Sequence, residues 1–194
     1  MHNLILASRN KGKIAECQFL LASSHYQVIG MEEAGFADDI EETGSTLMEN
    51  ALIKARYIHE KTNDAVLAED SGLFVDALEG APGVYSARYA GNHGDDKANW
   101  QLLLKNMEGI SQRNARFETC LCYIDAQGNE HFFTGVLQGK IAYEASGSFG
   151  FGYDPVFIPE GYEVSNACLE PAVKNSMSHR AEAISKWVGF MLEG

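Results

Sequence analysis

The sequence predicts an α/β protein with a mixed β-sheet, because strand patterns and helix patterns alternate along the chain. Short apolar runs such as Leu4 to Ala7 are followed by segments whose apolar residues recur at helical spacing. The turn residues Asp125 to Asn129 separate two strand patterns, which indicates a hairpin and hence at least one antiparallel pair. The 194 residues can bury a substantial core, and we predict a single domain over residues 1–194.

The N-terminal part of the chain begins with a buried strand and two helices. The strand at Leu4 to Ala7 leads through a polar turn, residues 8–13, into a helix whose apolar positions are Ile14, Cys17, Leu20 and Leu21. Thr46 and Glu49 have the spacing of a capping box, which predicts the start of a second helix. The apolar face of that helix consists of Leu47, Ala51, Ala55 and Ile58.

The remaining elements follow in the same alternating manner. The apolar run at residues 65–68 predicts a strand that enters a turn at residues 69–72. A third helix is indicated by the apolar spacing of Trp100, Leu103, Leu104 and Met107. Residues 117–123 alternate as a strand and lead through the turn into a partner strand at residues 131–136. The last helix has a buried side made of Ile184, Trp187, Val188 and Met191.

The charge distribution favours a small polyanionic ligand over a nucleic acid. The net charge of −12 argues against non-specific nucleic-acid binding, which relies on a basic surface. Residues 31–50 hold seven acidic side chains and no basic one, whereas cations gather near each terminus. An acidic protein can still bind a small polyanion where its cations converge and a metal bridges the rest.

Neither a membrane partner nor a secretory route is expected. No stretch approaches the roughly 20 apolar residues that a membrane helix needs. The N-terminal apolar run is only four residues long, with no charged segment before it and no cleavage pattern after it. The expected location is therefore the cytoplasm.

The four cysteines are too few and too scattered for a disulfide framework. Cys120 and Cys122 are two residues apart in a strand pattern, so both should face the same side. A zinc site would need a second pair of ligands, and the sequence offers no matching pair. We interpret all four as buried free thiols, namely Cys17, Cys120, Cys122 and Cys168.

The turn Ser8-Arg9-Asn10-Lys11-Gly12-Lys13 is a candidate phosphate site, because it lies between a strand and a helix. Backbone amides at a helix N-terminus favour phosphate, and Lys11 or Lys13 can add positive charge. The turn is not a P-loop, because Ala7 stands where the first glycine should be and Ile14 where Ser or Thr should be. Taken alone, the turn is equally explained as a solvated helix start.

Two acidic segments are candidates for a metal site. Glu41-Glu42-Thr43-Gly44 precedes the capped helix, and Glu69-Asp70-Ser71-Gly72 ends an apolar strand. Magnesium typically takes one or two carboxylates together with substrate phosphates. Because successive strand residues face opposite ways, only one of the two strand-end carboxylates should point into a given cleft. The alternatives are an acidic loop near a helix dipole and a simple Asp-Ser-Gly turn.

Two further segments are candidates for binding a nucleotide. Residues 147–155 alternate glycines with aromatic rings, and such a ring can stack on a nucleobase, although Phe149 could instead complete the core. Residues 174–180 gather the cations Lys174, His179 and Arg180 at the start of the last helix, where Ser178 is a good N-cap. Routine capping with solvated charges is the alternative for this second segment.

Taken in order, these motifs resemble the inosine triphosphate pyrophosphatase family, and most closely its bacterial dITP/XTP pyrophosphatase members. The resemblance spans nearly the whole chain, and the segments that carry it are residues 8–13, 41–44, 69–73, 80–89, 151–155 and 178–180. It implies an elongated α/β fold in which helices flank a central mixed sheet and an active-site cleft lies between two lobes. It also implies a homodimer.

The resemblance further implies an activity and a set of site residues. The activity is hydrolysis of dITP, ITP and XTP to the nucleoside monophosphate and pyrophosphate, with Mg²⁺ as cofactor. The metal would be held by Glu41 and Asp70, and Asp70 would also be the general base. The implied substrate contacts are Ser8, Arg9, Asn10, Lys11, Gly12, Lys13, Ser71, Phe151, Gly152, Tyr153, Asp154, Lys174, His179 and Arg180. Lys174 and Arg180 offer only hydrogen-bond donors, which suits the C6 oxygen of hypoxanthine and xanthine.

The chain departs from the family pattern at three places. Arg9 replaces the usual glycine of the phosphate turn, which adds a cation but keeps the backbone farther from the phosphates. Glu69 stands where bacterial members often have Asp, and Pro171 lies in a segment that is less charged than the family pattern. Two alternative functions stay open: a related pyrophosphatase for modified pyrimidine or methylated nucleotides, and a nucleotide-binding regulator without catalysis.

Overall fold

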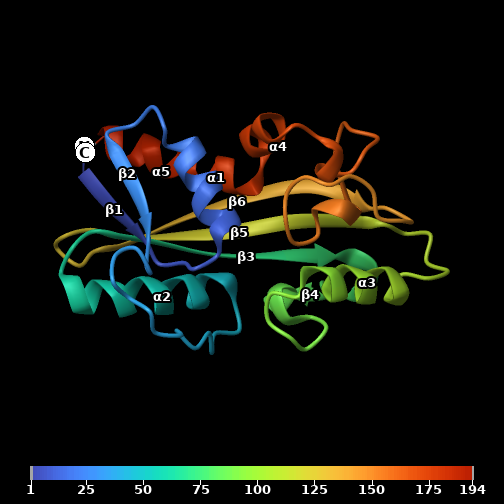
Figure 1. Cartoon of the computed structure of the whole chain (residues 1–194), viewed down its shortest axis with the longest axis horizontal. Coiled ribbons are helices and arrows are strands. Elements are labelled where there is room, and N and C mark those ends of the chain that lie inside the picture. The colour runs from blue at the N-terminus through green and yellow to red at the C-terminus, as the bar shows by residue number, and fades with distance from the viewer. Residues whose placement is uncertain (1, 194) are drawn as a thin grey trace. The chain divides into compact units, whose positions relative to one another are not determined.

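The computed structural model describes residues 2–193 and confirms the mixed α/β fold (Figure 1). Its helices are α1 (Lys11–Leu20), α2 (Leu47–Thr62), α3 (Asp96–Asn106), α4 (Pro171–Met177) and α5 (His179–Glu193). Its strands are β1 (His2–Leu6), β2 (Tyr26–Gly30), β3 (Val66–Val75), β4 (Pro82–Gly83), β5 (Asn114–Ile124), β6 (Glu130–Ile141) and β7 (Phe157–Pro159). Within the described residues they form one sheet in the order β2-β1-β3-β5-β6-β7, with β4 paired to β3.

The sheet is mixed because parallel and antiparallel pairs occur together. Strand β1 pairs in parallel with β2 and with β3, whereas β4 is antiparallel to β3 and β7 is antiparallel to β6. The predicted hairpin is confirmed, since β5 and β6 are neighbours and a backbone hydrogen bond from Asp125 to Asn129, 3.1 Å long, closes the turn between them.

The chain folds into two compact units. Unit 1 comprises Met1–Asp70, Thr119–Gly135 and Arg180–Gly194, and unit 2 comprises Ser71–Glu118 and Val136–His179. The strands β3, β5 and β6 contribute residues to both units. Each unit has hydrophobic core residues of its own. That the whole chain is a single domain stays a prediction.

In unit 1 the side chains of the strands alternate between two cores. Leu4, Leu6 and Leu67 pack in one core together with Trp187 of α5. Their neighbours in sequence face the other way and form a second core with α2, through Ile5, Ala7, Val66, Ala68, Ala51, Ala55 and Ile58. Figure 1 shows α1 and α5 on one face of the strands and α2 on the other. Period-two alternation therefore decides which helix each strand residue of unit 1 faces.

The predicted capping box at the start of α2 is confirmed. The Thr46 hydroxyl accepts a hydrogen bond of 3.1 Å from the Glu49 amide, and the Glu49 carboxylate accepts one of 3.1 Å from the Thr46 amide. The helix ends at Thr62 and is followed by Asn63, whose φ of 55° lies in the left-handed region. The predicted apolar face is buried toward the sheet, with Ala51, Ala55 and Ile58 fully buried.

Replacing Thr46 with alanine is expected to lower the free energy of unfolding by about 0.5–2 kcal/mol, because the Glu49 amide loses its acceptor, the Thr46 hydroxyl. Urea unfolding of the wild type and the variant measures this change. The control Thr46→Ser keeps the hydroxyl and should lose at most a few tenths of a kcal/mol. Equal losses in the two variants would mean that the methyl group matters and the cap does not.

Unit 2 buries one face of α3, together with Met107 and Arg113 from the chain that follows it. Leu103 of α3 and Met107, the residue after its end, pack with Val75, Val156 and Phe157, which confirms the predicted third helix. Arg113 is buried as well, and its guanidinium donates to the carbonyls of Met107 and Ile141 at 2.9 and 3.0 Å. One carbonyl belongs to the residue that follows α3 and the other to the last residue of β6. Arg113 therefore connects the end of α3 to the end of β6 within unit 2.

The turn predicted at residues 69–72 is wrong, because β3 runs through these residues and ends at Val75. The Asp-Ser-Gly sequence stays extended because the strand has a partner there: Leu73 is opposite Gly83 of β4. A β-carbon on Gly72 would lie 2.3 Å from the Gly83 carbonyl oxygen. The glycine therefore permits a close backbone approach and does not make a turn.

Two further predictions need correction. Cys17, Cys120 and Cys122 are buried free thiols as predicted, but Cys168 is exposed, because it ends a short 3-10 turn on the surface. The segment 174–180 is not one helix start. Lys174 lies in α4, which begins at Pro171, and Ser178 separates this short helix from α5.

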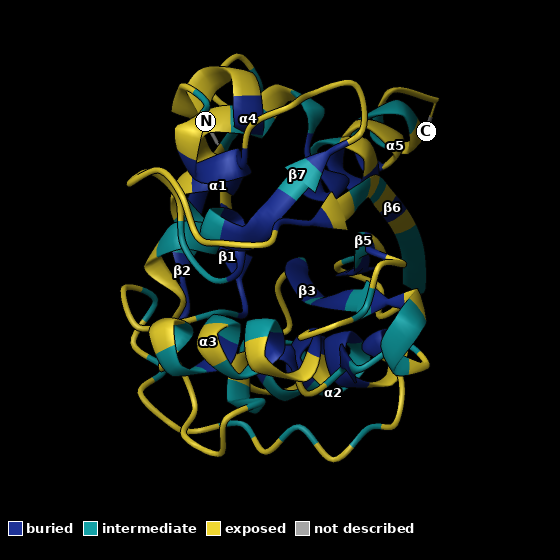
Figure 2. Ribbon diagram, turned by 90° about the vertical axis from the view of Figure 1, so that its right-hand side faces the viewer, coloured by how far each residue is buried: buried dark blue, intermediate teal, exposed yellow. Residues whose placement is uncertain are grey.

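In Figure 2 most of β3 is coloured as buried and the outward faces of the helices as exposed. Among the described residues, no helix is long and apolar enough to cross a membrane.

Candidate active site

The alternation of β3 sends its two acidic residues to opposite faces of unit 1, as predicted. Leu67 packs in the core beneath α1 and α5, whereas Val66 and Ala68 pack in the core beneath α2. Glu69 therefore falls on the side of α1 and α5, and Asp70 on the side of α2. Both side chains are buried, with exposed fractions of 0% and 8%.

On the α2 side, Asp70 is held by two polar residues of the helix. Asn50 donates to Asp70 Oδ2 at 3.1 Å, and the Lys54 ammonium lies 3.3 Å from Asp70 Oδ1. The same ammonium donates to Glu42 Oε1 at 2.6 Å. The backbone of Asp70 is fixed separately, because the Thr119 hydroxyl donates to its carbonyl oxygen at 3.0 Å. The carboxylate is thus buried, paired and directed by α2.

The Lys54 ammonium shows how two carboxylates of this site share one cation. Burial by itself lowers the pKa of Lys54, but the charges of Asp70 and Glu42 outweigh it and raise the pKa above its ordinary value. Lys54 is therefore positively charged between two hard oxygen donors. Carboxylate oxygens such as these are the ligands that hard divalent cations prefer.

The structure brings Glu42, rather than Glu41, into the chain of contacts that ends at Asp70. Glu41 is exposed in the segment before α2, and its predicted role as a metal ligand is left as a prediction. Among residues 2–193, no three His, Cys, Asp or Glu side chains are grouped as a metal site.

On the opposite face, Glu69 belongs to a buried ion-pair network. Arg180 of α5 donates to both oxygens of Glu69, with distances of 2.7 and 2.8 Å, and its third nitrogen donates to Glu16 of α1. Lys13 Nζ lies 3.4 Å from Glu69 Oε1. Burial alone would lower the pKa of Arg180, but the charges of Glu69 and Glu16 raise it. Each nitrogen of the guanidinium is thus engaged by a carboxylate.

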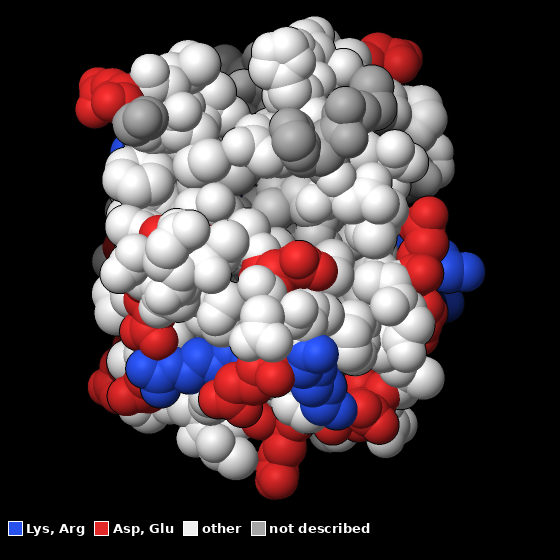
Figure 3. Space-filling view, turned by 90° about the vertical axis from the view of Figure 1, so that its left-hand side faces the viewer, with Lys and Arg blue, Asp and Glu red and all other residues white. Residues whose placement is uncertain are grey.

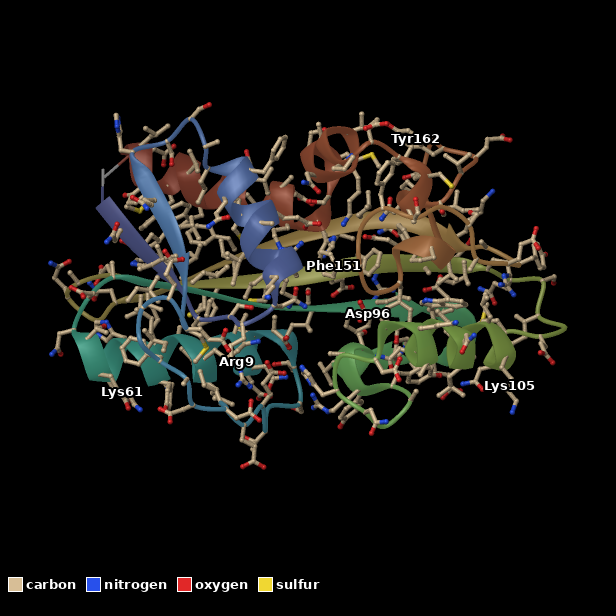
Figure 4. All side chains as sticks on the ribbon, in the orientation of Figure 1. Arg9, Lys61, Asp96, Lys105, Phe151 and Tyr162 are labelled. Carbon is tan, nitrogen blue, oxygen red and sulfur yellow. The ribbon has the colours of Figure 1, made fainter. Side chains whose placement is uncertain are left out.

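The predicted phosphate turn forms the N-terminus of α1. Asn10 is the N-cap, and its side chain accepts from the Lys13 amide at 3.1 Å, while its own amide donates to the Ser8 hydroxyl at 3.2 Å. Lys11, Gly12 and Lys13 are the first residues of the helix. Arg9, labelled in Figure 4, is exposed. It forms an ion pair with Asp39. In the view of Figure 3, basic side chains lie next to acidic ones in the same way.

In unit 2, Asp154 organises the glycine-rich loop of residues 147–154. Its Oδ2 accepts from the Phe151 amide at 3.0 Å and lies 2.8 Å from Lys174 Nζ. Its Oδ1 accepts from Asn166 at 3.1 Å. The Lys174 ammonium also lies 4.8 Å from the centre of the Phe151 ring. Three of the predicted base contacts, Phe151, Asp154 and Lys174, are therefore brought together.

The other residues predicted in unit 2 have different surroundings. Gly152 has a φ of 62°, and its amide donates to Asp96 of α3 at 2.7 Å. Tyr153 is buried, and its hydroxyl donates to the Ser86 carbonyl at 2.9 Å. His179 is buried and stacks on Phe117, with ring centres 5.0 Å apart. Ser71 is half-buried on β3.

Sequence patterns missed several polar residues that the site uses. Asn50 and Lys54 lie on the buried face of α2, at the spacing of Leu47, Ala51, Ala55 and Ile58. A polar residue on the apolar face of a helix must find a buried partner, and this signal could have pointed to both. The sequence patterns did not indicate Glu16, Asp96 or Asn166 either, whose partners lie 164, 56 and 12 positions away along the chain.

Comparison with known proteins supports a single assignment. The sequence model described as the Ham1 family matches residues 4–190. A dITP/XTP pyrophosphatase of Oceanobacillus iheyensis is 46% identical over 195 residues, with 97% of this chain and 98% of that protein covered. A dITP/XTP pyrophosphatase of Bacillus subtilis is 44% identical, with 96% of this chain and 95% of that protein covered. The resemblance noted from the motifs is thereby confirmed.

Solved structures agree with the sequence comparison. A HAM1 protein from Coxiella burnetii has a TM-score of 0.89 at 39% identity, and the match covers 100% of both chains. The Ham1 protein of Staphylococcus aureus has a TM-score of 0.87 at 38% identity, and 98% of each chain is covered. Fold and sequence therefore lead to the same family.

Proposed function

Because the chain belongs to the Ham1 family, we propose that it hydrolyses dITP, ITP and XTP to the nucleoside monophosphate and pyrophosphate. The relatives named dITP/XTP pyrophosphatase support this substrate class. The observation that carries the proposal is the buried Asp70 carboxylate, which Asn50 and Lys54 hold in unit 1. These contacts fix the direction of the carboxylate, and a general base must be held within hydrogen-bond reach of the proton that it takes.

In the proposed reaction, a water molecule attacks the α-phosphorus. The water oxygen forms the new bond to phosphorus while the bond to the bridging oxygen of the β-phosphate breaks. Asp70 takes the proton of the water, and the leaving pyrophosphate carries away the electron pair of the broken bond. Lys54 keeps the Asp70 carboxylate oriented, because it lies between this carboxylate and Glu42.

Magnesium is the metal proposed for this reaction, held by Asp70 and Glu41. When bound, it would supply positive charge that neutralises the phosphate oxygens. The buried Asp70 carboxylate and the acidic segment before α2 provide the hard oxygen donors that this ion prefers.

Ser8 to Lys13 are proposed to bind the phosphates, through backbone amides at the start of α1 and the Lys13 ammonium. Phe151 is proposed to stack on the purine, with Gly152, Tyr153 and Asp154 shaping the loop around it. Lys174, His179, Arg180 and Ser71 are proposed as further substrate contacts. Of these, Arg180 is the residue whose nitrogens are all engaged by carboxylates.

The test of the proposed function is a substrate panel. Pyrophosphate release is measured with ITP, XTP, dITP, ATP and GTP, with and without magnesium. Release from ITP, XTP and dITP that exceeds release from ATP and GTP, and that depends on magnesium, is expected. Turnover only of modified pyrimidine or methylated nucleotides would indicate the related pyrophosphatase instead. Binding of ITP without release of pyrophosphate would indicate a regulator.

Replacing Lys13 with alanine is expected to raise KM for every triphosphate by about tenfold to a hundredfold, because a charge-assisted contact to phosphate is lost. KM for ITP, XTP and ATP measures the effect. Lys105→Ala removes an exposed lysine of α3 and serves as the control. A loss that depends on the base would mean that Lys13 contacts the base rather than the phosphates.

Replacing Phe151 with alanine is expected to raise KM for ITP by about one to two powers of ten, because the stacking surface is removed. Steady-state kinetics and thermal melting are measured together. An unchanged KM combined with a lower melting temperature would assign the ring to core packing.

We also propose that the protein is a homodimer and acts in the cytoplasm. The family resemblance supports the first statement. Sedimentation of the purified protein tests the first, and cell fractionation tests the second.

A further inference from the structure

Two consecutive backbone amides in the loop of residues 147–154, those of Phe151 and Gly152, donate to carboxylates, and each carboxylate comes from a different element. The Phe151 amide donates to Asp154, which lies three residues further along the same loop. The Gly152 amide donates to Asp96 Oδ2 at 2.7 Å, and Asp96 is 56 positions away, at the start of α3. Asp154 belongs to the segment proposed to bind the base, whereas Asp96 lies outside that segment.

The carboxylate of Asp96 is not needed to cap α3, because its neighbour does so. Asp95 is the N-cap, and its Oδ1 accepts from the Ala98 amide at 3.0 Å. The Asp96 side chain instead reaches the loop. Figure 4 shows Asp96 and Phe151 on these two segments of unit 2. The adjacent aspartates thus have separate tasks, one within the helix and one on the loop.

The Ser148 and Phe149 amides hold the start of the loop by donating to the Ala167 carbonyl, but the backbone around Phe151 has the conformational freedom of its two flanking glycines. Gly150 and Gly152 have φ values of 79° and 62°, so Phe151 lies between two residues in the left-handed region. A β-carbon at Gly152 would meet no atom within 4 Å, so packing does not fix the chain there. The direction of the Phe151 ring therefore depends on hydrogen bonds to the amides on either side of its α-carbon.

We propose that Asp96 is a positioning residue for purine binding, which holds the Gly152 amide and thereby sets the Phe151 ring against the base. This inference rests on the proposed function of the loop. It assigns to α3 a part in base recognition that does not involve contact with the substrate. The effect should appear in KM for nucleotides and not in the chemical step, because the reacting groups lie elsewhere in the chain.

The test compares Asp96→Ala, Asp96→Asn and Asp95→Ala by two measurements. The first is the hydrogen-exchange rate of the Gly152 amide, which needs no substrate. It should rise about tenfold or more in Asp96→Ala, because the amide loses its acceptor. Asp96→Asn keeps an acceptor oxygen and should restore most of the protection. Asp95→Ala should loosen the start of α3 and leave the Gly152 amide protected.

The second measurement is steady-state hydrolysis of ITP with tripolyphosphate as a competitive inhibitor. Asp96→Ala should raise KM by about tenfold, with kcat within about twofold and the inhibition constant of tripolyphosphate unchanged. An equal rise in the tripolyphosphate constant, no rescue by Asn, or the same KM in Asp96→Ala and Asp95→Ala would each overturn the proposal. Absence of ITP hydrolysis by the wild type would overturn the proposed function instead, and the hydrogen-exchange result would still decide the anchoring contact.

Discussion

Replacing Asp70 with asparagine is expected to lower the turnover of ITP by about 10²- to 10⁴-fold, because the proposed general base is lost. The fold should survive the change. The amide oxygen of asparagine can still accept from Asn50 or Lys54, so the buried position keeps a hydrogen-bond partner. Pyrophosphate release at saturating magnesium measures the loss, and thermal melting confirms that the variant is folded.

A matched control is available in the same unit. Asp38→Asn removes an equal charge from an exposed carboxylate, which pairs with Lys61 and Tyr57 on the surface. This control should keep the wild-type rate. If Asp70→Asn also kept it, Asp70 would be a structural partner of α2, and the general base would have to be sought elsewhere.

The parts of the fold that follow from local patterns were predictable from the sequence. The start of α2 is fixed by Thr46 and Glu49, which are three residues apart and cap the helix without help from the rest of the chain. The same holds for the alternation of β5 and for the turn before β6. In each case the residues that decide the structure lie within a few positions of one another in the sequence.

The end of β3 was not predictable, because it depends on a partner strand. Asp70, Ser71 and Gly72 are good turn residues, but β3 continues through them because it is paired in the sheet, with β4 at Leu73 and Phe74 and with β5 on its other side. The same limit applies to the site. The sequence indicates Asp70 as a candidate, but its contact with Lys54 requires β3 to lie over one particular turn of α2.

Arg180 shows this limit most clearly. Its position beside Ser178 and His179 suggests a cation near a helix start that is free to bind an anion. In the structure it pairs with Glu69, which is 111 positions away, and with Glu16, which is 164 positions away. Partners at such separations are set by the packing of α1, β3 and α5 in unit 1, which no local pattern reports.

Replacing Arg180 with methionine is expected to lower the free energy of unfolding by about 3–5 kcal/mol, because two buried carboxylates lose their counter-charge. Glu69 and Glu16 have side-chain exposed fractions of 0% and 6%, so water cannot replace the guanidinium without opening the core. Lys13 lies 3.4 Å from Glu69 and compensates only part of the loss. Urea unfolding of the wild type, Arg180→Met and Arg180→Lys measures the effect, and lysine should recover only part because it lacks the fork that contacts both oxygens.

The source of the loss is identified by removing the carboxylates too. Combining Arg180→Met with Glu69→Gln and Glu16→Gln should recover much of the stability, since neutral amides leave no unpaired charge in the core. Activity with ITP, XTP and ATP is then measured at a temperature where each variant is folded. An intact unfolding free energy in Arg180→Met, together with a narrower ITP-to-ATP ratio, would show that Arg180 selects the base. A large stability loss with the ratio unchanged would instead establish it as the residue that joins α1, β3 and α5.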